Sequence, residues 1–260
     1  MLLCTGQDLT VLKYQRFILY NEYVMSISPL ERASDTPPAG EVHKESSETH
    51  ITVISPDNPR WNEAIELESA TFVRRGYVES PEELSREYAA YLPKTSIILA
   101  EHVATKEVSG CARVIEYDPE IGFKTLDDAL DEEKSLEIDT SGWEALEEID
   151  HDNIYEVGTI SARQDAGAEL YGAIIGYGLD KTPRRQYVIA SLDEQVFMKR
   201  ILPLFGDSVQ ILGPPADYMG SSTIPIMINL EKAWENIAAN DYLQGIFERV
   251  EEGRKMVSHG

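Results

Sequence analysis

Histidine and cysteine, the side chains that most often hold metals or act as nucleophiles, are scattered in this chain of 260 residues. No two histidines have the spacing that places metal ligands on one helix face, and none lies near the serine pattern of a hydrolase. Cys4 falls in an expected tail and Cys111 in an expected strand, so we expect no disulfide. We therefore expect no metal site and no Ser-His-Asp hydrolase. The histidines are His43, His50, His102, His151 and His259.

Three glycines in LYGAIIGYGLD, which are Gly172, Gly176 and Gly178, have a spacing faintly like that of a dinucleotide-binding loop. Such a loop must stand in a turn between a strand and a helix, whereas these glycines fall inside a predicted helix. We expect them to allow close packing of that helix on the sheet.

A carboxylate, an arginine and a tyrosine are better placed for acid–base chemistry. Glu156 and Gly158 stand in YEVGTISA, and a glycine inside a strand often marks a bulge. Arg113 stands in VSGCARVIEY, and Tyr218 stands between a GPP turn and TIPIMINL. The alternatives are a flexible glycine, a surface carboxylate, an exposed strand arginine and a tyrosine that packs on its own loop.

The hydrophobic pattern indicates the elements that would position these side chains. Their order predicts an α+β fold, an α/β sandwich with one mostly antiparallel sheet covered by helices. The predicted strands cover 51–55, 96–104, 108–117, 154–162, 186–192, 208–212 and 223–230, and the predicted helices cover 61–72, 80–92, 167–180, 193–206 and 231–256.

The chain is predicted to form one domain over 50–260, with residues 1–49 as a peripheral N-terminal segment and polar linker. An acidic insertion lies at about 120–153, and we interpret it as a solvated surface because the regular spacing of a calcium loop is absent. A salt-adapted host is another explanation of its charge.

The formal net charge of −23 excludes a nucleic-acid partner and disfavours an anionic membrane. No window is apolar enough for a membrane span, and the start of the chain lacks the pattern of a signal peptide. These observations predict a cytoplasmic protein.

The predicted element order resembles that of the GCN5-related N-acetyltransferases, and the residues resemble the branch of acyl-homoserine-lactone synthases and long-chain N-acyl amino acid synthases. The resemblance rests on TFVRRGYVESPEELSREYAAY, VSGCARVIEY, YEVGTISA and the segment 193–230 with its GPP, Tyr-x-Gly and strand proline. It implies a mixed sheet with helices on both faces, whose fourth and fifth strands splay apart.

For activity, the resemblance implies an N-acyltransferase that moves a fatty acyl group from acyl-CoA or acyl carrier protein to a small amine or amino acid. The thioester would be a co-substrate, with no permanently bound cofactor. Two alternatives stay open: an acetyl-CoA-dependent N-acetyltransferase, and a catalytically silent module that binds an acyl ligand or a protein.

The resemblance also implies roles for particular residues. A backbone amide at a bulge formed by Val157 and Gly158 would polarise the thioester carbonyl, and Glu156 would act as general base. Tyr218 would give a proton to the leaving thiolate. Arg113 would hold the acceptor's carboxylate or brace Glu156.

Two sets of residues are expected to meet the phosphates of the donor. Arg74 and Arg75 follow the first helix, where this branch keeps a basic residue, although a surface pair is the alternative. With Arg184 and Arg185 they could form a basic patch for a carrier protein. The loop before the central helix would bind the cofactor through Arg163, Gln164, Gly167 and Ala168.

Two departures from the family pattern qualify these roles. Glu169 stands where a small residue belongs, and a carboxylate would oppose a pyrophosphate at a helix N-terminus. This favours a longer acyl thioester over acetyl-CoA. The chain also keeps Glu156 but lacks the Ser-Arg that usually follows, which puts lactone formation in doubt.

Overall fold

The structure, a computed structural model of the chain, describes residues 49–163, 166–239 and 244–258. The described residues all belong to one compact unit, Ser46–Gly260. The predictions for the segment 1–49, apart from its last residue, and for Gln164 lie outside the described residues. No helix in the described part of the chain is long and apolar enough to cross a membrane.

One mixed sheet organises this unit, with the strands in the order β1-β2-β3-β4-β5-β8-β6 and β7 paired to β8. Every pairing is antiparallel except that of β4 with β5, which is parallel. This confirms the predicted α+β fold with a mostly antiparallel sheet. The strands are β1 (Thr49–Ile54), β2 (Thr95–His102), β3 (Val108–Glu116), β4 (Ile154–Ala162), β5 (Tyr187–Asp193), β6 (Val209–Ile211), β7 (Ala216–Tyr218) and β8 (Ser221–Asn229).

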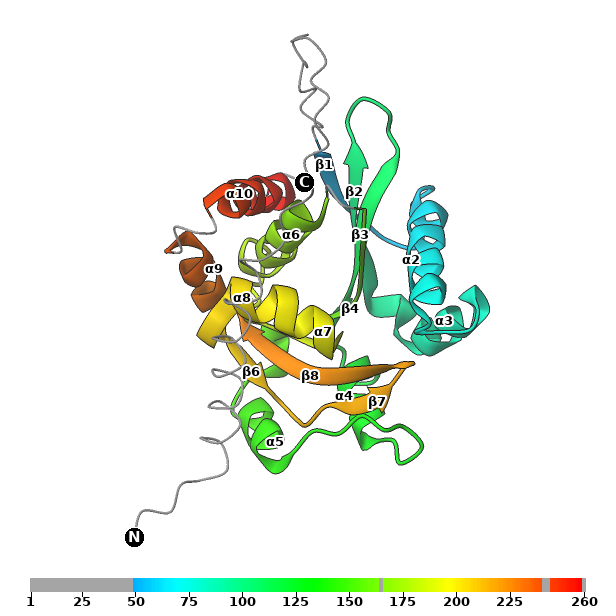
Figure 1. Cartoon of the computed structure of the whole chain (residues 1–260), viewed down its shortest axis with the longest axis vertical. Coiled ribbons are helices and arrows are strands. Elements are labelled where there is room, and N and C mark those ends of the chain that lie inside the picture. Colours follow the sequence, from blue (N-terminus) through cyan, green and yellow to red (C-terminus); the bar gives the residue numbers. More distant parts are fainter. Residues whose placement is uncertain (1–48, 164–165, 240–243, 259–260) are drawn as a thin grey trace, which may run out of the picture. The chain divides into compact units, whose positions relative to one another are not determined.

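Helices cover both faces of this sheet, as the resemblance implied. Figure 1 shows α2 and α3 on one side of β2, β3 and β4, with α6 and α10 on the other. The main helices are α2 (Trp61–Arg75), α3 (Pro81–Tyr88), α4 (Lys124–Leu130), α5 (Thr140–Glu147), α6 (Gly167–Leu179), α8 (Leu202–Phe205), α9 (Leu230–Ala238) and α10 (Gln244–Ser258). Short helical turns cover Ala89–Lys94, His151–Asn153, Glu194–Val196, Phe197–Ile201 and Gly206–Ser208.

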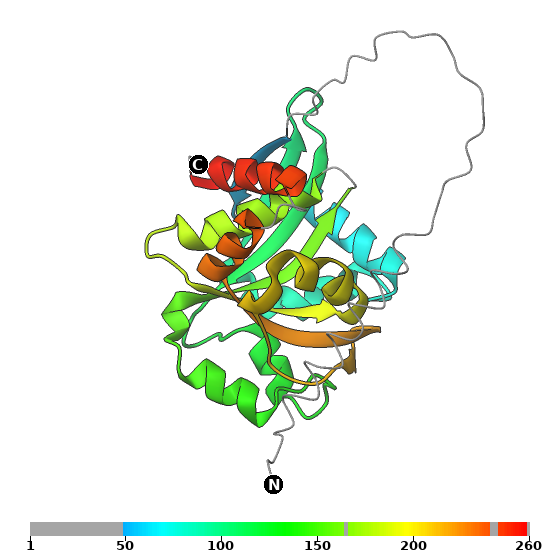
Figure 2. The same cartoon turned by 60° about the vertical axis from the view of Figure 1, so that its left-hand side comes forward.

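The glycines of α6 permit a close approach, but to α10 more than to the sheet. A Cβ at Gly172 would lie 1.8 Å from the carbonyl oxygen of Val250, and one at Gly176 would lie 2.9 Å from that of Arg254. Gly178 alone faces a sheet residue, because its Cβ would lie 2.8 Å from the ring of Tyr155. Figures 1 and 2 both show α10 lying against α6.

The fourth and fifth strands part along their length. Their parallel pairing covers three residue pairs, from Ile154 opposite Tyr187 to Glu156 opposite Ile189. No further pairing joins the two strands, although both are described throughout and continue to Ala162 and Asp193. The splay predicted from the resemblance is therefore confirmed, and it begins at Glu156.

A bulge lies at the same point of β4. Arg113 pairs with Thr159 and the next residue, Val114, pairs with Val157, so the register of β3 skips Gly158. Gly158 and Thr159 then face the same side of the sheet, because a bulge interrupts the alternation of the side chains. The glycine thus marks a bulge, as predicted.

The acidic segment packs on the sheet, and its interpretation as a solvated surface insertion is wrong for its apolar residues. Its buried side chains form one apolar cluster with residues of β4, β5 and β8, because the acidic residues alternate with apolar ones that face inward. Lys124, Thr125 and Asp128 are also buried at its first helix, α4. The cluster contains Phe123, Leu126, Ile138, Leu146, Ile154, Ile189, Leu212 and Met227.

Candidate active site

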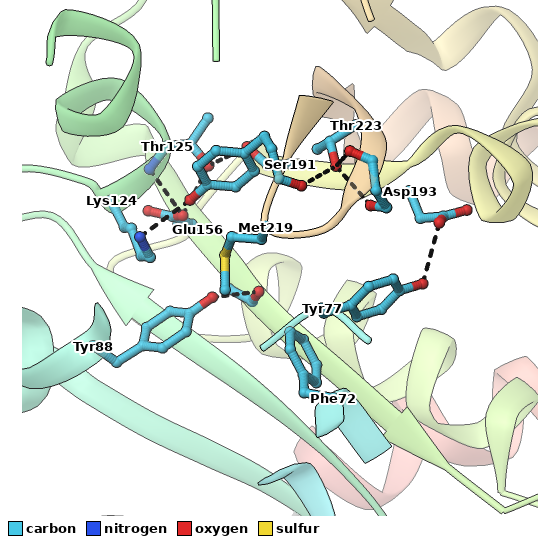
Figure 3. A pocket seen from close by; sticks show the side chains of 13 residues that line it. Phe72, Tyr77, Tyr88, Lys124, Thr125, Glu156, Ser191, Asp193, Met219 and Thr223 are labelled. Atoms are coloured by element: carbon cyan, nitrogen blue, oxygen red, sulfur yellow. Dashed lines mark hydrogen bonds between the residues drawn. The ribbon is translucent and has the colours of Figure 1, made fainter. Parts of the chain in front are cut away.

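A pocket of about 60 Å³ lies on the α2, α3 and α4 side of the sheet, beside the splay (Figure 3). Its walls come from β4, the C-terminal half of β5, β7, the start of β8 and the three helices, so residues distant in sequence converge there. Its lining consists of Phe72, Tyr77, Tyr88, Lys124, Thr125, Glu156, Gly158, Ser191, Asp193, Tyr218, Met219, Ser221 and Thr223.

Glu156 is the buried carboxylate of this pocket, with 2% of its surface exposed. Its Oε1 accepts hydrogen bonds from the backbone N–H of Thr125 at 3.1 Å and from the Thr125 hydroxyl at 2.8 Å. Its Oε2 has no hydrogen-bond partner among the described residues. One oxygen is therefore held in place while the other is left for a ligand or a proton.

Burial raises the pKa of Glu156 to about 7, against the hydrogen bonds from Thr125 and the charge of Lys124, which favour the carboxylate. A carboxyl group that titrates near neutral pH suits both taking and returning a proton. The prediction of Glu156 as a base thus gains a physical reason that the sequence could not supply.

Tyr218 lies where a tight hairpin places it. Tyr218 pairs with Ser221, and the two residues between them, Met219 and Gly220, both have positive φ, of 47° and 70°. Such angles belong to the two-residue turns that suit the twist of a hairpin. The turn brings the tyrosine into the pocket wall, where its side chain faces α4.

The hydroxyl of Tyr218 belongs to a buried network with Lys124 and Asp128. It donates to the Asp128 carboxylate and accepts from the Lys124 ammonium at 3.1 Å. Burial and the Asp128 charge raise the pKa of Tyr218 above its usual value. Its proton is thus directed at Asp128 and not at the open part of the pocket, which argues against the predicted role as proton donor to a thiolate.

At the rim of the pocket, Asp193 ends β5 and caps the helical turn that follows. Its Oδ1 accepts from the backbone N–H groups of Gln195 and Val196. Its Oδ2 accepts from the Tyr77 hydroxyl at 3.2 Å. Asp193 and Glu156 thus place two carboxylates on one cavity.

Arg113 does not contact Glu156 and is not among the pocket-lining residues. Its Nε and Nη2 donate to the carboxylate of Glu68 at 2.9 and 2.6 Å, and both side chains are buried. Its guanidinium lies 4.6 Å from the centre of the Tyr88 ring. The expectation that it braces Glu156 is therefore wrong, because Glu68 supplies its partner, and we assign Arg113 a positioning role behind Tyr88.

Arg74 and Arg75 are exposed at the end of α2, and Arg75 is close enough to Tyr77 to lower its pKa, against the larger effect of burial. Arg184 and Arg185 pair with Glu231 and Glu116, just before β5 begins. Arg184 and Arg185 therefore lie at the start of β5, whereas Tyr77, two residues after Arg75, donates to Asp193 at the end of β5. The two ends of β5 are six residue steps apart, roughly 20 Å. The four arginines therefore do not form one patch.

The predicted cofactor loop leads from β4 into α6. Arg163 pairs with Glu107 on the surface, Gly167 begins α6, and a Cβ at Gly167 would meet nothing within 4 Å. Ala168 is half-buried and packs on the core instead of facing a ligand. Arg249 donates to both oxygens of Glu169 at 2.6 Å, so its charge offsets the carboxylate that we expected to oppose a pyrophosphate.

A second pocket, of about 40 Å³, lies on the opposite face of the same strands. Val157 lines it from β4, and Val188, Ala190 and Leu192 line it from β5, since alternate residues of a strand face opposite sides. Every other lining residue is also apolar or aromatic: Ile160, Tyr171, Ile174, Ile175, Ile201, Phe205, Ile226, Ile228, Leu230 and Ala233. Val157, predicted to bind substrate through the bulge, thus carries its side chain into an apolar cavity.

Several residues of the site were missed in the sequence. Lys124, Thr125 and Asp128 were hidden because the segment around them reads as an acidic surface. Glu68 left a signal, since it is the charged residue among the buried positions of α2, and its burial is explained by Arg113. Tyr88 left none.

No protein-family model and no curated protein matches the chain. Among solved structures, the chain is similar to FeeM, an N-acyl amino acid synthase from uncultured soil microbes, with a TM-score of 0.49 and 13% identity over 76% of this chain and 98% of FeeM. It is also similar to BjaI, a CoA-dependent acyl-homoserine lactone synthase with SAM and isopentyl-CoA bound, with a TM-score of 0.43 and 17% identity over 78% and 90% of the two chains.

A third similar structure is a spermidine N-acetyltransferase from Vibrio cholerae with CoA and spermine, with a TM-score of 0.41 and 13% identity over 71% and 98% of the two chains. These scores and identities are too low to transfer a substrate or a residue's role. The function proposed below rests on the pockets and the splayed strands.

Proposed function

We propose that this protein is an N-acyltransferase that moves an acyl group from a thioester to the nitrogen of a small amine. The observation that carries the proposal is the parting of β4 and β5 directly after Glu156. At that point one face holds a buried carboxylate with a free oxygen, and the opposite face holds an apolar cavity. A thioester lying between the strands would place its carbonyl near the carboxylate and its acyl chain in the cavity.

Glu156 acts as the general base in this proposal. Its Oε2 takes a proton from the acceptor ammonium, directly or through a water, and the neutral amine then attacks the thioester carbonyl. Because the pKa of Glu156 is about 7, the carboxylate is available at neutral pH and remains basic enough to accept the proton.

The bulge of β4 polarises the carbonyl. A bulged backbone leaves its extra residue outside the ladder, and an amide directed at the developing oxyanion stabilises the transition state. We assign this role to the backbone at Val157 and Gly158, where the register of β3 skips a residue.

The reaction balances without a further reagent. The C–N bond of the amide forms, the C–S bond of the thioester breaks, and the ammonium loses two protons. One of them is released to solvent and one returns to the thiolate. We assign the return to Glu156, because the hydroxyl of Tyr218 already donates to Asp128.

The apolar lining of the second pocket supports a fatty acyl donor over acetyl, and its walls must part when such a chain enters, because about 40 Å³ is little more than the volume of one water molecule. Its lining contains no charged residue, and burying each methylene of an acyl chain contributes about 0.8 kcal/mol. Acyl-CoA and acyl carrier protein present the same thioester arm, so either is a suitable donor. We propose that Arg74 and Arg75, which are exposed at the end of α2, meet the phosphates of the arm.

Thiol release from acyl-CoA of increasing length, from acetyl to palmitoyl, tests the proposal with a panel of amines as acceptors. We expect the turnover rate to rise with chain length and to fall roughly 10²–10⁴-fold in Glu156→Gln. A preference for acetyl-CoA would support an N-acetyltransferase instead. Absence of turnover with every donor and acceptor, including donors loaded on a carrier protein, would contradict the proposal and favour a silent binding module.

A further inference from the structure

The chemistry of the acceptor can be read from the charges of the pocket. Among the described residues that line it, Lys124 is the one cation. Its ammonium donates to Glu87 at 2.9 Å, to Asp128, and to the Tyr218 hydroxyl at 3.1 Å. A lysine ammonium has three N–H donors, so these three acceptors use all of them. Lys124 has no donor left for an incoming carboxylate.

The partners of Lys124 cancel its charge. Glu87 and Asp128 bring two negative charges, which balance the ammonium groups of Lys124 and of Lys134, the latter paired with Glu87 at 3.0 Å. Burial of Lys124 at 2% exposure leaves little solvent to screen these charges. Glu156 and Asp193 add two further carboxylates to the lining. The cavity therefore has a net negative charge at any pH at which Glu156 is ionised.

The nearest arginines do not reverse this balance. Arg113 is 4% exposed, donates to Glu68 in a buried pair, and lies behind the Tyr88 ring. Arg75 is exposed and does not line the cavity. An α-amino acid carries its carboxylate on the same carbon as the reacting amine, so that carboxylate would have to lie beside Glu156 and not at the rim.

The aromatic walls at the rim suit a cation instead. Phe72 and Tyr77 lie edge to face with their ring centres 5.3 Å apart, and both line the pocket beside Asp193. Aromatic faces attract ammonium groups, and the effect grows when the group is desolvated.

We infer that the acceptor is an amine that enters as a cation and carries no carboxylate next to the reacting nitrogen. This inference rests on the proposed function for the identity of the reacting group. It narrows the acceptor from small amines in general to decarboxylated amines, and it sets amino acids aside.

Calorimetric binding of matched pairs tests the inference without requiring turnover. The pairs are tyramine with tyrosine, agmatine with arginine, and phenethylamine with phenylalanine, each titrated into the full chain with and without a non-hydrolysable acyl-CoA analogue. Tyrosine amide serves as the control, since it keeps the size of tyrosine and removes the negative charge. We expect each amine to bind at least about tenfold more tightly than its amino acid, a difference of about 1.4 kcal/mol. Tyrosine amide should bind like tyramine.

Equal or tighter binding of the amino acids would overturn the inference, and so would binding by none of the six ligands. Glu156→Gln tests whether the preference for amines arises at this carboxylate. Its loss should weaken the binding of the amines and should not weaken the binding of the amino acids. If the amines bind as expected but no acyl group is transferred from any donor, the inference about the ligand stands and the proposed function fails.

Discussion

The phenol of Tyr88 packs against the bulge of β4 and forms a hydrogen bond with it. Its hydroxyl donates to the carbonyl oxygen of Gly158 at 2.8 Å, and its ring occupies the space that a side chain at position 158 would need. A Cβ at Gly158 would lie 2.7 Å from the Cε1 of Tyr88. Only a glycine fits at position 158, because the Tyr88 ring occupies the space of a side chain. The shape of the bulge therefore depends on Tyr88.

Substitution of Gly158 by alanine should damage both stability and turnover. The added methyl group forces the Tyr88 ring or the bulge to move, at a cost of about 1–3 kcal/mol in the free energy of unfolding. Chemical denaturation measures this cost, and thiol release measures the fall in kcat. Tyr88→Phe is the matched control, because it keeps the ring and loses only the hydrogen bond, at about 0.5–1.5 kcal/mol. An alanine variant as stable and as active as wild type would refute the role of the bulge.

Replacement of Arg113 by methionine distinguishes a buried positioning pair from a substrate-binding arginine. The change leaves the Glu68 carboxylate buried without its guanidinium, which should lower the free energy of unfolding by about 3–5 kcal/mol. The double variant Arg113→Met with Glu68→Met should recover most of that loss, and its KM for the acceptor should stay near the wild-type value. A stable single variant with a raised KM would instead restore the substrate-binding role.

The fold could be predicted because its determinants are local and repeated. The alternation of β4 and β5, the Ser80 cap of α3 and the Asp193 cap are each written in a few adjacent residues. The bulge was predictable for the same reason, since an interior glycine is a local sign of an interrupted ladder. The terminal helix was predicted as one element but is described as two, α9 and α10.

The site was predicted only in part, because it depends on contacts between distant segments. Glu156 has its neighbour Thr125 from a segment whose charge suggested solvent, and no local pattern shows that α4 turns inward. Arg113 was expected to brace Glu156, but its partner is Glu68. The sequence does not show that α2 crosses β3, and without that contact it cannot tell which of the two carboxylates Arg113 binds. Residue types limit the chemistry, whereas pairings follow from the tertiary packing.

The stability of the protein should depend on the protonation of Glu156. Burial raises its pKa from 4.5 to about 7, so the folded state binds the proton more tightly than the unfolded state does. The stabilisation is fully present below the unfolded pKa and is lost as the pH rises through about 7. Relative to Glu156→Gln, the wild type should lose about 2–3 kcal/mol of unfolding free energy between about pH 5 and pH 9. Urea denaturation of both proteins across this range measures the difference, and a constant difference would show that Glu156 titrates normally.

Narrowing the apolar cavity should shorten the preferred acyl chain. Ala190 lines the cavity from β5 and is 4% exposed, so Ala190→Leu fills part of the space without adding a polar group. The ratio of kcat/KM for a long acyl-CoA to that for a short one should fall by roughly tenfold, which corresponds to about two lost methylene contacts. Ala168→Leu is a matched control on α6, outside the cavity lining. An unchanged ratio in Ala190→Leu would mean that the acyl chain lies elsewhere.

Thr125 should set the pH at which Glu156 begins to act. Its hydroxyl and its backbone N–H both donate to Oε1, and these hydrogen bonds favour the ionised carboxylate. Thr125→Val removes the hydroxyl bond and keeps the shape, so the pKa of Glu156 should rise further. The acidic limb of the kcat/KM profile, expected near pH 7 in the wild type, should then move upward by roughly one pH unit. Thr125→Ser retains the hydroxyl and should hold the limb at its wild-type position. If both variants leave the limb where it is, the group that titrates in the rate profile is not Glu156, and the base must be sought among the other residues of the pocket.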